Sequence, residues 1–189
     1  MGILRIRKTQ TSVGAVAYTA GDEVSNSATV GSVVRATYDL SGFTRGKVLA
    51  CGVDLTPASA DAVTTAADFE LLLFRTPDAP AAVGDNAAHP IAAAVAALAV
   101  ARFRLDDTGW TGPLGTVAAG ASQIQRVMPT RVQPLAANVL EYPVPFFPFS
   151  FEGLTLAQRE LTLVIRALAA WTPVNVVNTF GVTLDLEME

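Results

Sequence analysis

Apolar and polar residues alternate along much of the chain with a period of two, the spacing typical of β-strands that bury one face. In the clearest run, residues 180–188, every second residue from Phe180 to Met188 is apolar. We expect this apolar set to face the core. Asp185 and Glu187 should then lie on the solvent or partner face, because a slip of one residue would bury both carboxylates.

Further strands are predicted wherever alternation or a dense apolar run is bounded by turn residues. They cover residues 34–40, 49–55, 69–74 and 161–168, with weaker patterns at 3–8, 13–18, 100–105 and 139–144. Only residues 91–98, which are rich in alanine and follow a proline, favour a helix. About nine short strands with one short Ala-rich helix predict an all-β fold, an antiparallel β-sandwich.

Residues 13–189 are predicted to form a single β-sandwich domain, preceded by an N-terminal arm or edge strand at residues 1–12. The Pro/Phe-rich segment 142–151 departs from the strand pattern, because its prolines exclude it from a central strand while its rings are costly to expose. An extended segment at a sheet edge satisfies both constraints. Its rings pack either on the chain's own core or on a neighbouring subunit. The candidate interface residues are therefore Tyr142, Phe146, Phe147, Phe149 and Phe151.

The charge content points to an assembly. Of the 189 residues, 51% are apolar and only 16% are charged, compared with about 25% charged in an average protein. A net charge of −4 argues against nucleic acid as a partner, although Arg5 and Arg7 could reach an acidic neighbour. No stretch approaches the roughly 20 strongly apolar residues of a spanning helix, which argues against a membrane. We expect a homo-oligomer.

Few residues could support catalysis. His89 is the only histidine, and its position between Ala88 and Pro90 favours a loop or capping role over that of a general base. Cys51, the only cysteine, lies in an apolar strand pattern and is predicted to be an inert buried thiol. Asp85 and Asn86 favour a turn. The sequence therefore predicts no enzyme, no metal site and no cofactor.

Three stretches, in order, resemble a pattern found in structural proteins of tailed phages. Residues 18–24 read YTAGDEV, residues 71–77 read LLLFRTP and lead to GDNAA at 84–88, and residues 161–171 read LTLVIRALAAW. A closing strand, TFGVTLDLE at 179–187, completes the pattern. Within this group the chain is most similar to capsid decoration, or cement, proteins. Residues 109–153 have no counterpart in the pattern.

The resemblance implies a jelly-roll type of sandwich on the outer surface of the virion capsid, made in the host cytoplasm and bound to the major capsid protein. It also implies a homo-oligomer, with a trimer as the preferred state, and it carries over no catalytic residue. The alternative is a tail- or fibre-associated module that binds host glycan. Trp110 and Trp171, which lie beside glycine or close to proline, are the candidate aromatic contacts for such a glycan.

Overall fold

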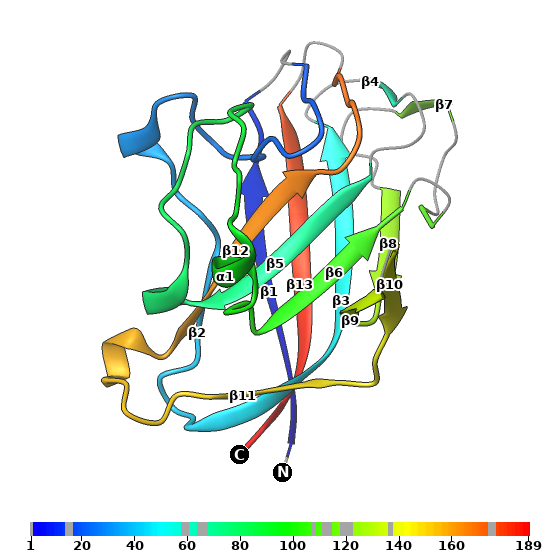
Figure 1. The fold of residues 1–189 in the computed structure, drawn as a ribbon. Helices are drawn as coiled ribbons and strands as arrows, with labels where there is room; N and C mark the ends of the chain where they lie inside the picture. Colours follow the sequence, from blue (N-terminus) through cyan, green and yellow to red (C-terminus); the bar gives the residue numbers. More distant parts are fainter. Residues whose placement is uncertain are drawn as a thin grey trace.

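The computed structural model describes residues 2–13, 17–57, 61–63, 68–106, 109–110, 115–117, 123–135, 138–173 and 177–189. Two antiparallel sheets face each other (Figure 1). The larger sheet has the order β1-β13-β3-β11, and β8 pairs with β3 beside this path. Its strands are β1 (Gly2–Thr11), β13 (Asn178–Met188), β3 (Arg45–Pro57), β11 (Phe147–Ser150) and β8 (Gln123–Val127).

The smaller sheet has the order β2-β12-β5-β6. Its strands are β2 (Thr37–Asp39), β12 (Glu160–Ala167), β5 (Phe69–Arg75) and β6 (Ala101–Leu105). Two strand pairs lie outside these sheets, β4 (Asp61–Val63) with β7 (Gly115–Val117) and β9 (Thr130–Leu135) with β10 (Asn138–Pro143). The helices are short: α1 (Ala93–Ala96) and the 3₁₀ turns η1 (Val30–Ser32), η2 (Thr76–Asp78) and η3 (Leu156–Gln158).

The pairing of the strands defines a jelly roll. The first strand of the sandwich pairs with the last, β1 with β13, and the second with the second-last, β2 with β12. Next, β3 pairs with β8, and β5 pairs with β6. This is the arrangement of a long hairpin rolled into two facing sheets, with β13 inserted between β1 and β3 and β12 between β2 and β5. The predicted all-β, jelly-roll type of sandwich is therefore confirmed.

The core lies between the two sheets and is rich in aromatic rings. Phe69 is fully buried and packs edge-on against Trp171 and Phe180, with ring centroids 5.1 Å apart in each pair. Such close edge-to-face contacts add to the roughly 2–3 kcal/mol gained by burying each ring. Outside the smaller sheet, residues 91–99, which include α1 and which we call the α1 segment, cover a second apolar cluster through Ile91 and Val95.

Most of the predicted strands are present. The prediction for residues 180–188 is confirmed in its core face, since Phe180 and Leu184 are fully buried. It is wrong for the exposure of Asp185, which is only 6% exposed because Arg5 and Arg126 cover it on the outer face of the sheet. The predicted helix at 91–98 is shorter, at Ala93–Ala96, and the predicted strand at 13–18 lies partly outside the described residues.

Strand β8 was not predicted from the sequence because its polar residues face inward and its apolar residue faces outward. Gln123 and Gln125 are each 6% exposed, whereas Ile124 between them is 52% exposed. Two buried glutamines and an exposed isoleucine give no apolar face to detect. Within residues 142–151, strand β11 lies at an end of the sheet order, where the missing N–H of Pro148 is tolerated.

Candidate interface surface

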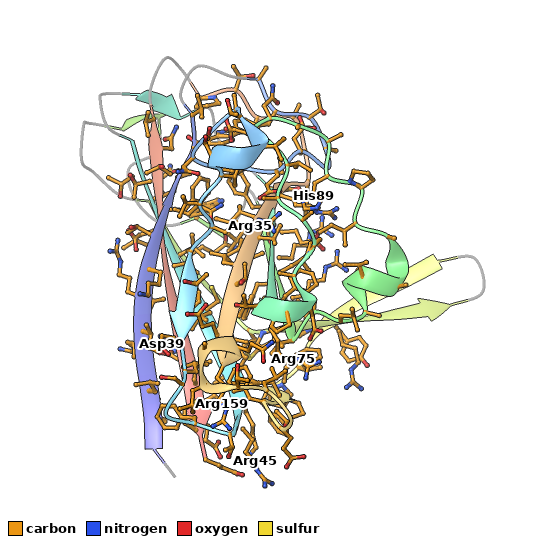
Figure 2. The ribbon with its side chains drawn as sticks, turned by 90° about the vertical axis from the view of Figure 1, so that its left-hand side faces the viewer. Arg35, Asp39, Arg45, Arg75, His89 and Arg159 are labelled. Atoms are coloured by element: carbon orange, nitrogen blue, oxygen red, sulfur yellow. The ribbon has the colours of Figure 1, made fainter. Side chains whose placement is uncertain are left out.

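The outer face of the larger sheet is an open surface of the fold. In Figure 2, β1, β13 and β3 form the left-hand layer, and apart from β4 and β7 at its upper end no described element lies outside it. We call the outward side of β1, β13, β3 and β8 the sheet face. Its register aligns Arg5 with Asp185, and Thr9 with Gly181 and Asp54.

Ion pairs cross the sheet face from strand to strand. Nε of Arg5 on β1 donates to Oδ1 of Asp185 on β13 at 2.6 Å, and Arg126 on β8 contacts the other carboxylate oxygen. The hydrogen bond from Arg5 lowers the pKa of Asp185 below its ordinary value, against the opposing effect of burial. Nη2 of Arg7 donates to Oδ2 of Asp54 on β3 at 2.7 Å.

The Arg7–Asp54 ion pair depends on a glycine. These two side chains meet above Gly181 of β13, the strand between them. A Cβ at Gly181 would collide with the Arg7 guanidinium and with both carboxylate oxygens of Asp54. The absence of a side chain in the middle strand therefore lets the two outer strands connect directly.

Exposed apolar side chains lie among these charges at the lower end of the sheet face, where the two chain termini meet (Figure 1). Ile3 on β1 is 74% exposed, and Phe146, just before β11, is 45% exposed. The Nζ of Lys47 lies 5.5 Å from the centre of the Phe146 ring and pairs with Glu187 at 2.9 Å. Apolar and aromatic groups beside ion pairs are a composition typical of protein–protein interfaces.

The structure divides the candidate interface residues predicted from the sequence. Arg5 and Arg7 lie on the sheet face in separate ion pairs, and Phe146 lies at its lower end beside Lys47. Phe149 and Phe151 instead pack into the chain's own core, 8% and 0% exposed, with ring centroids 5.3 Å apart. The side chains of Tyr142 and Phe147 are half-buried, and Phe147 packs under the guanidinium of Arg131.

Parts of the stretches that carry the phage resemblance, residues 18–24, residues 84–88 and Trp171, converge at the opposite end of the sandwich. Residues 18–24 lie between the end of β12 and residues 84–89. Tyr18 forms a bridge to Trp171, with the rings stacked at 5.0 Å, and its hydroxyl donates to Asp85 at 2.7 Å. Asp22 bridges to Ala88. These residues are far apart in the sequence and form one buried cluster, which we call the motif cluster.

A buried ion pair lies within the motif cluster (Figure 2). Glu23 is fully buried, and Nε and Nη2 of Arg35 donate to its two oxygens at 2.7 and 2.8 Å. Nδ1 of His89 lies 2.7 Å from Oε2 of the same carboxylate. Burial by itself raises the pKa of Glu23, but His89 and Arg35 outweigh it and hold the pKa below its ordinary value. His89 thus lies in a loop, as its sequence context favoured, and it also pairs with the buried Glu23, which that context did not indicate.

Asp85 has the opposite electrostatic balance. Burial raises the pKa of its carboxyl, although Tyr18 and the backbone N–H of Ser25 both donate to it. The predicted turn is confirmed, since Asp85 and Asn86 form a turn in which Asn86 has a φ of 57°. Asp85 therefore joins the turn to Tyr18 and to residues 25–28.

The remaining candidate residues are mostly buried. Trp171 is 6% exposed, which removes it as an open platform for a glycan ring, and Trp110 is half-buried with its ring against Phe69. Cys51 is fully buried, as predicted, and burial raises the pKa of its thiol. Within the described ranges, no three His, Cys, Asp or Glu side chains are grouped to hold a metal ion. No helix in this part of the chain has the length and apolar character to cross a membrane.

Comparisons with known proteins add little to this description. No protein-family model and no curated protein sequence matches the chain. Similar solved structures include the BFDV capsid protein as a 60-mer (9% identity, covering 100% of this chain and 93% of that chain, TM-score 0.33) and sacbrood virus of honeybee (7%, 99% and 71%, 0.35). Another is winged bean acidic lectin (9%, 98% and 100%, 0.30). At these identities and TM-scores the matches assign neither a family nor an activity to the chain.

Proposed function

We propose that the chain is a non-enzymatic structural protein of a tailed-phage particle, which decorates and cements the capsid shell from outside. The observation that carries this proposal is the sheet face, where Ile3 and Phe146 are exposed among ion pairs on an uncovered sheet. Interfaces combine apolar anchors with charged groups that fix orientation in this way. The partners would be the major capsid protein and further copies of the chain, with a trimer as the preferred state.

Cementing needs rigidity and contact area, and no chemistry. A jelly roll with a dense aromatic core supplies the rigid body, and many copies held by the symmetry of a shell add avidity. Three buried carboxylates with shifted pKa values, Glu23, Asp85 and Asp185, are each held by hydrogen bonds or ion pairs within the fold. Their environments are explained by folding, which favours a structural protein over an enzyme.

The phage setting comes from the resemblance of the three stretches described above. The packing of residues 18–24 against residues 84–88 and Trp171 in the motif cluster supports the resemblance, because residues that interact to specify a fold are those that a shared fold would retain together. The closing stretch has a second role, since Asp185 and Glu187 within it lie on the sheet face.

The proposal is tested by the copy number of the chain in purified particles and by rebinding to shells depleted of it. We expect a copy number that is stoichiometric with the major capsid protein. The double variant Ile3→Ser/Phe146→Ser should lose rebinding while its thermal unfolding stays unchanged. Val30→Ser, at a residue that is 59% exposed but lies on η1, is the matched control and should rebind normally. Rebinding by the double variant at wild-type strength would overturn the proposal.

A further inference from the structure

A cavity of about 400 Å³ opens beyond the smaller sheet, on the opposite side of the sandwich from the sheet face. Its apolar part comes from the α1 segment, through Ile91, Ala96 and Ala97, and from Leu72 of β5. Its other wall comes from β9 and β11. Volumes in this range suit small ligands or a few side chains of a bound peptide.

The charged residues that line the cavity carry a net positive charge. Among the described lining residues, Arg102, Arg131 and Arg166 provide three positive charges, whereas Glu70 provides the single negative one. Glu70 is 3% exposed and binds both Arg102 and Arg166, which lie on the two strands that flank β5. Arg131 lies on the opposite wall, exposed, with its guanidinium 5.8 Å from the Phe147 ring centre.

This imbalance contrasts with the rest of the molecule. The whole chain carries a net charge of −4, so a positively charged cavity is a local feature. The buried carboxylate of Glu70 pairs with the guanidinium groups of Arg102 and Arg166 and holds both in place, while it neutralises one of the three positive charges. The lining residues therefore carry a net charge of two positive units, from three arginines and one glutamate. Apolar walls have a low dielectric constant, so an opposite charge is bound more strongly beside them than in water.

We propose that this cavity binds an acidic peptide segment of a partner protein, with a carboxylate facing Arg131 and an aliphatic side chain against the α1 segment. Arginine is suited to the carboxylate because its planar guanidinium can donate two parallel hydrogen bonds. The small side chains of Ala96 and Ala97 leave room for a branched apolar side chain next to that charge. This inference does not depend on shell binding, since it uses the other side of the sandwich.

The probe is a fluorescent, end-blocked pentapeptide of sequence Leu-Glu-Leu-Asp-Leu, compared with its uncharged amide twin Leu-Gln-Leu-Asn-Leu by fluorescence anisotropy with the full chain. We expect the acidic peptide to bind about tenfold more tightly than its twin, and less tightly as salt is added. Arg131→Gln should weaken binding of the acidic peptide about three- to tenfold. Arg45→Gln, an exposed arginine at the far end of the molecule in Figure 2, should leave binding unchanged.

A second pair of variants tests the apolar wall. Ala97→Trp should fill the cavity and abolish binding, whereas Ala92→Trp, an equally exposed position that does not line the cavity, should not. Circular dichroism would verify that each variant is folded. Equal binding of the acidic and amide peptides, no binding at millimolar concentration, or equal effects of Arg131→Gln and Arg45→Gln would overturn the proposal. Displacement of the peptide by oligothymidylate would also overturn it, in favour of a nucleic acid.

Discussion

The motif cluster and the sheet face are built from the same kinds of ion pair in different surroundings. In the motif cluster, the side chains of Arg35 and Glu23 are 7% and 0% exposed. On the sheet face, those of Arg7 and Asp54 are 50% and 23% exposed at the same distance of 2.7 Å. Geometry alone therefore does not distinguish the two pairs. The amount of water around them does.

This difference in solvation assigns the pairs different roles. Breaking a buried pair leaves one charge without water or a partner, which is strongly destabilising, whereas an exposed charge that loses its partner is solvated again. The motif cluster is therefore a requirement of the fold. The exposed Arg7–Asp54 pair of the sheet face contributes little to folding and can exchange partners when another protein approaches.

The largest effect is expected for Arg35→Met, which leaves the buried Glu23 carboxylate with His89 and the Val83 N–H as its remaining partners among the described residues. The free energy of unfolding should fall by about 3–5 kcal/mol. Urea denaturation measures the change. Arg7→Met is the matched control on the sheet face, and a similar loss in both variants would remove the contrast between the two regions.

An intermediate effect is expected for Asp185→Asn. This carboxylate lies on the sheet face but is nearly covered by Arg5 and Arg126, so removing its charge weakens two charged hydrogen bonds. A loss of about 1–3 kcal/mol in the free energy of unfolding is expected. Glu187→Gln, two residues along the same strand and better solvated, should cost less; the reverse order would show that burial does not set the scale.

A pH titration of stability sharpens the comparison further. The pKa of Glu23 is lowered in the folded state, so its contribution is complete above the unfolded value of about 4.3 and is lost as pH falls through the folded pKa. The pKa of Asp185 is lowered too, so its contribution to stability is also lost as pH falls. The pKa of Asp85 is raised, so its ionisation destabilises the folded state as pH rises. Between pH 5 and pH 3, Glu23→Gln should flatten the fall of the urea midpoint. Glu152→Gln, at an exposed carboxylate, should leave that fall as in the parent chain.

The smallest effect is expected for Asp54→Asn, which weakens the pair that crosses Gly181. The loss should be about 0.2–1 kcal/mol and should shrink as salt is added. Thermal unfolding at low and high salt measures both. A loss above that of Asp185→Asn would contradict the ranking.

Periodicity alone predicted the strands whose two faces differ in polarity. β13 is the clearest case, since its alternating residues placed Phe180 and Leu184 in the core. Periodicity did not predict β8, because polar residues occupy its inward-facing positions: Gln125 is buried and Ile124 is exposed. It also could not foresee that Asp185 is covered, since Arg5 and Arg126 approach it from strands distant in the sequence.

The candidate sites were less predictable than the fold. Arg5, Arg7 and Phe146 were recognisable as interface candidates because charges or rings without a local partner draw attention in a sequence. The arginine-lined cavity had no such signal, because Arg102, Arg131 and Arg166 come from three different strands. The strand order of the smaller sheet brings Arg102 and Arg166 together, and β9, which contacts β6, adds Arg131; no local pattern in the sequence indicates either arrangement.

The pairing of β1 with β13 also constrains how the chain folds. These strands align Gly2 with Met188 and Thr11 with Thr179, so β1 pairs with a strand that is made much later than itself. On the ribosome, β1 must wait as an unpaired strand until residues 178–188 have emerged, and closing so long a loop makes folding slow. The arginines and lysine of β1 would meanwhile discourage pairing with the same strand of a neighbouring nascent chain.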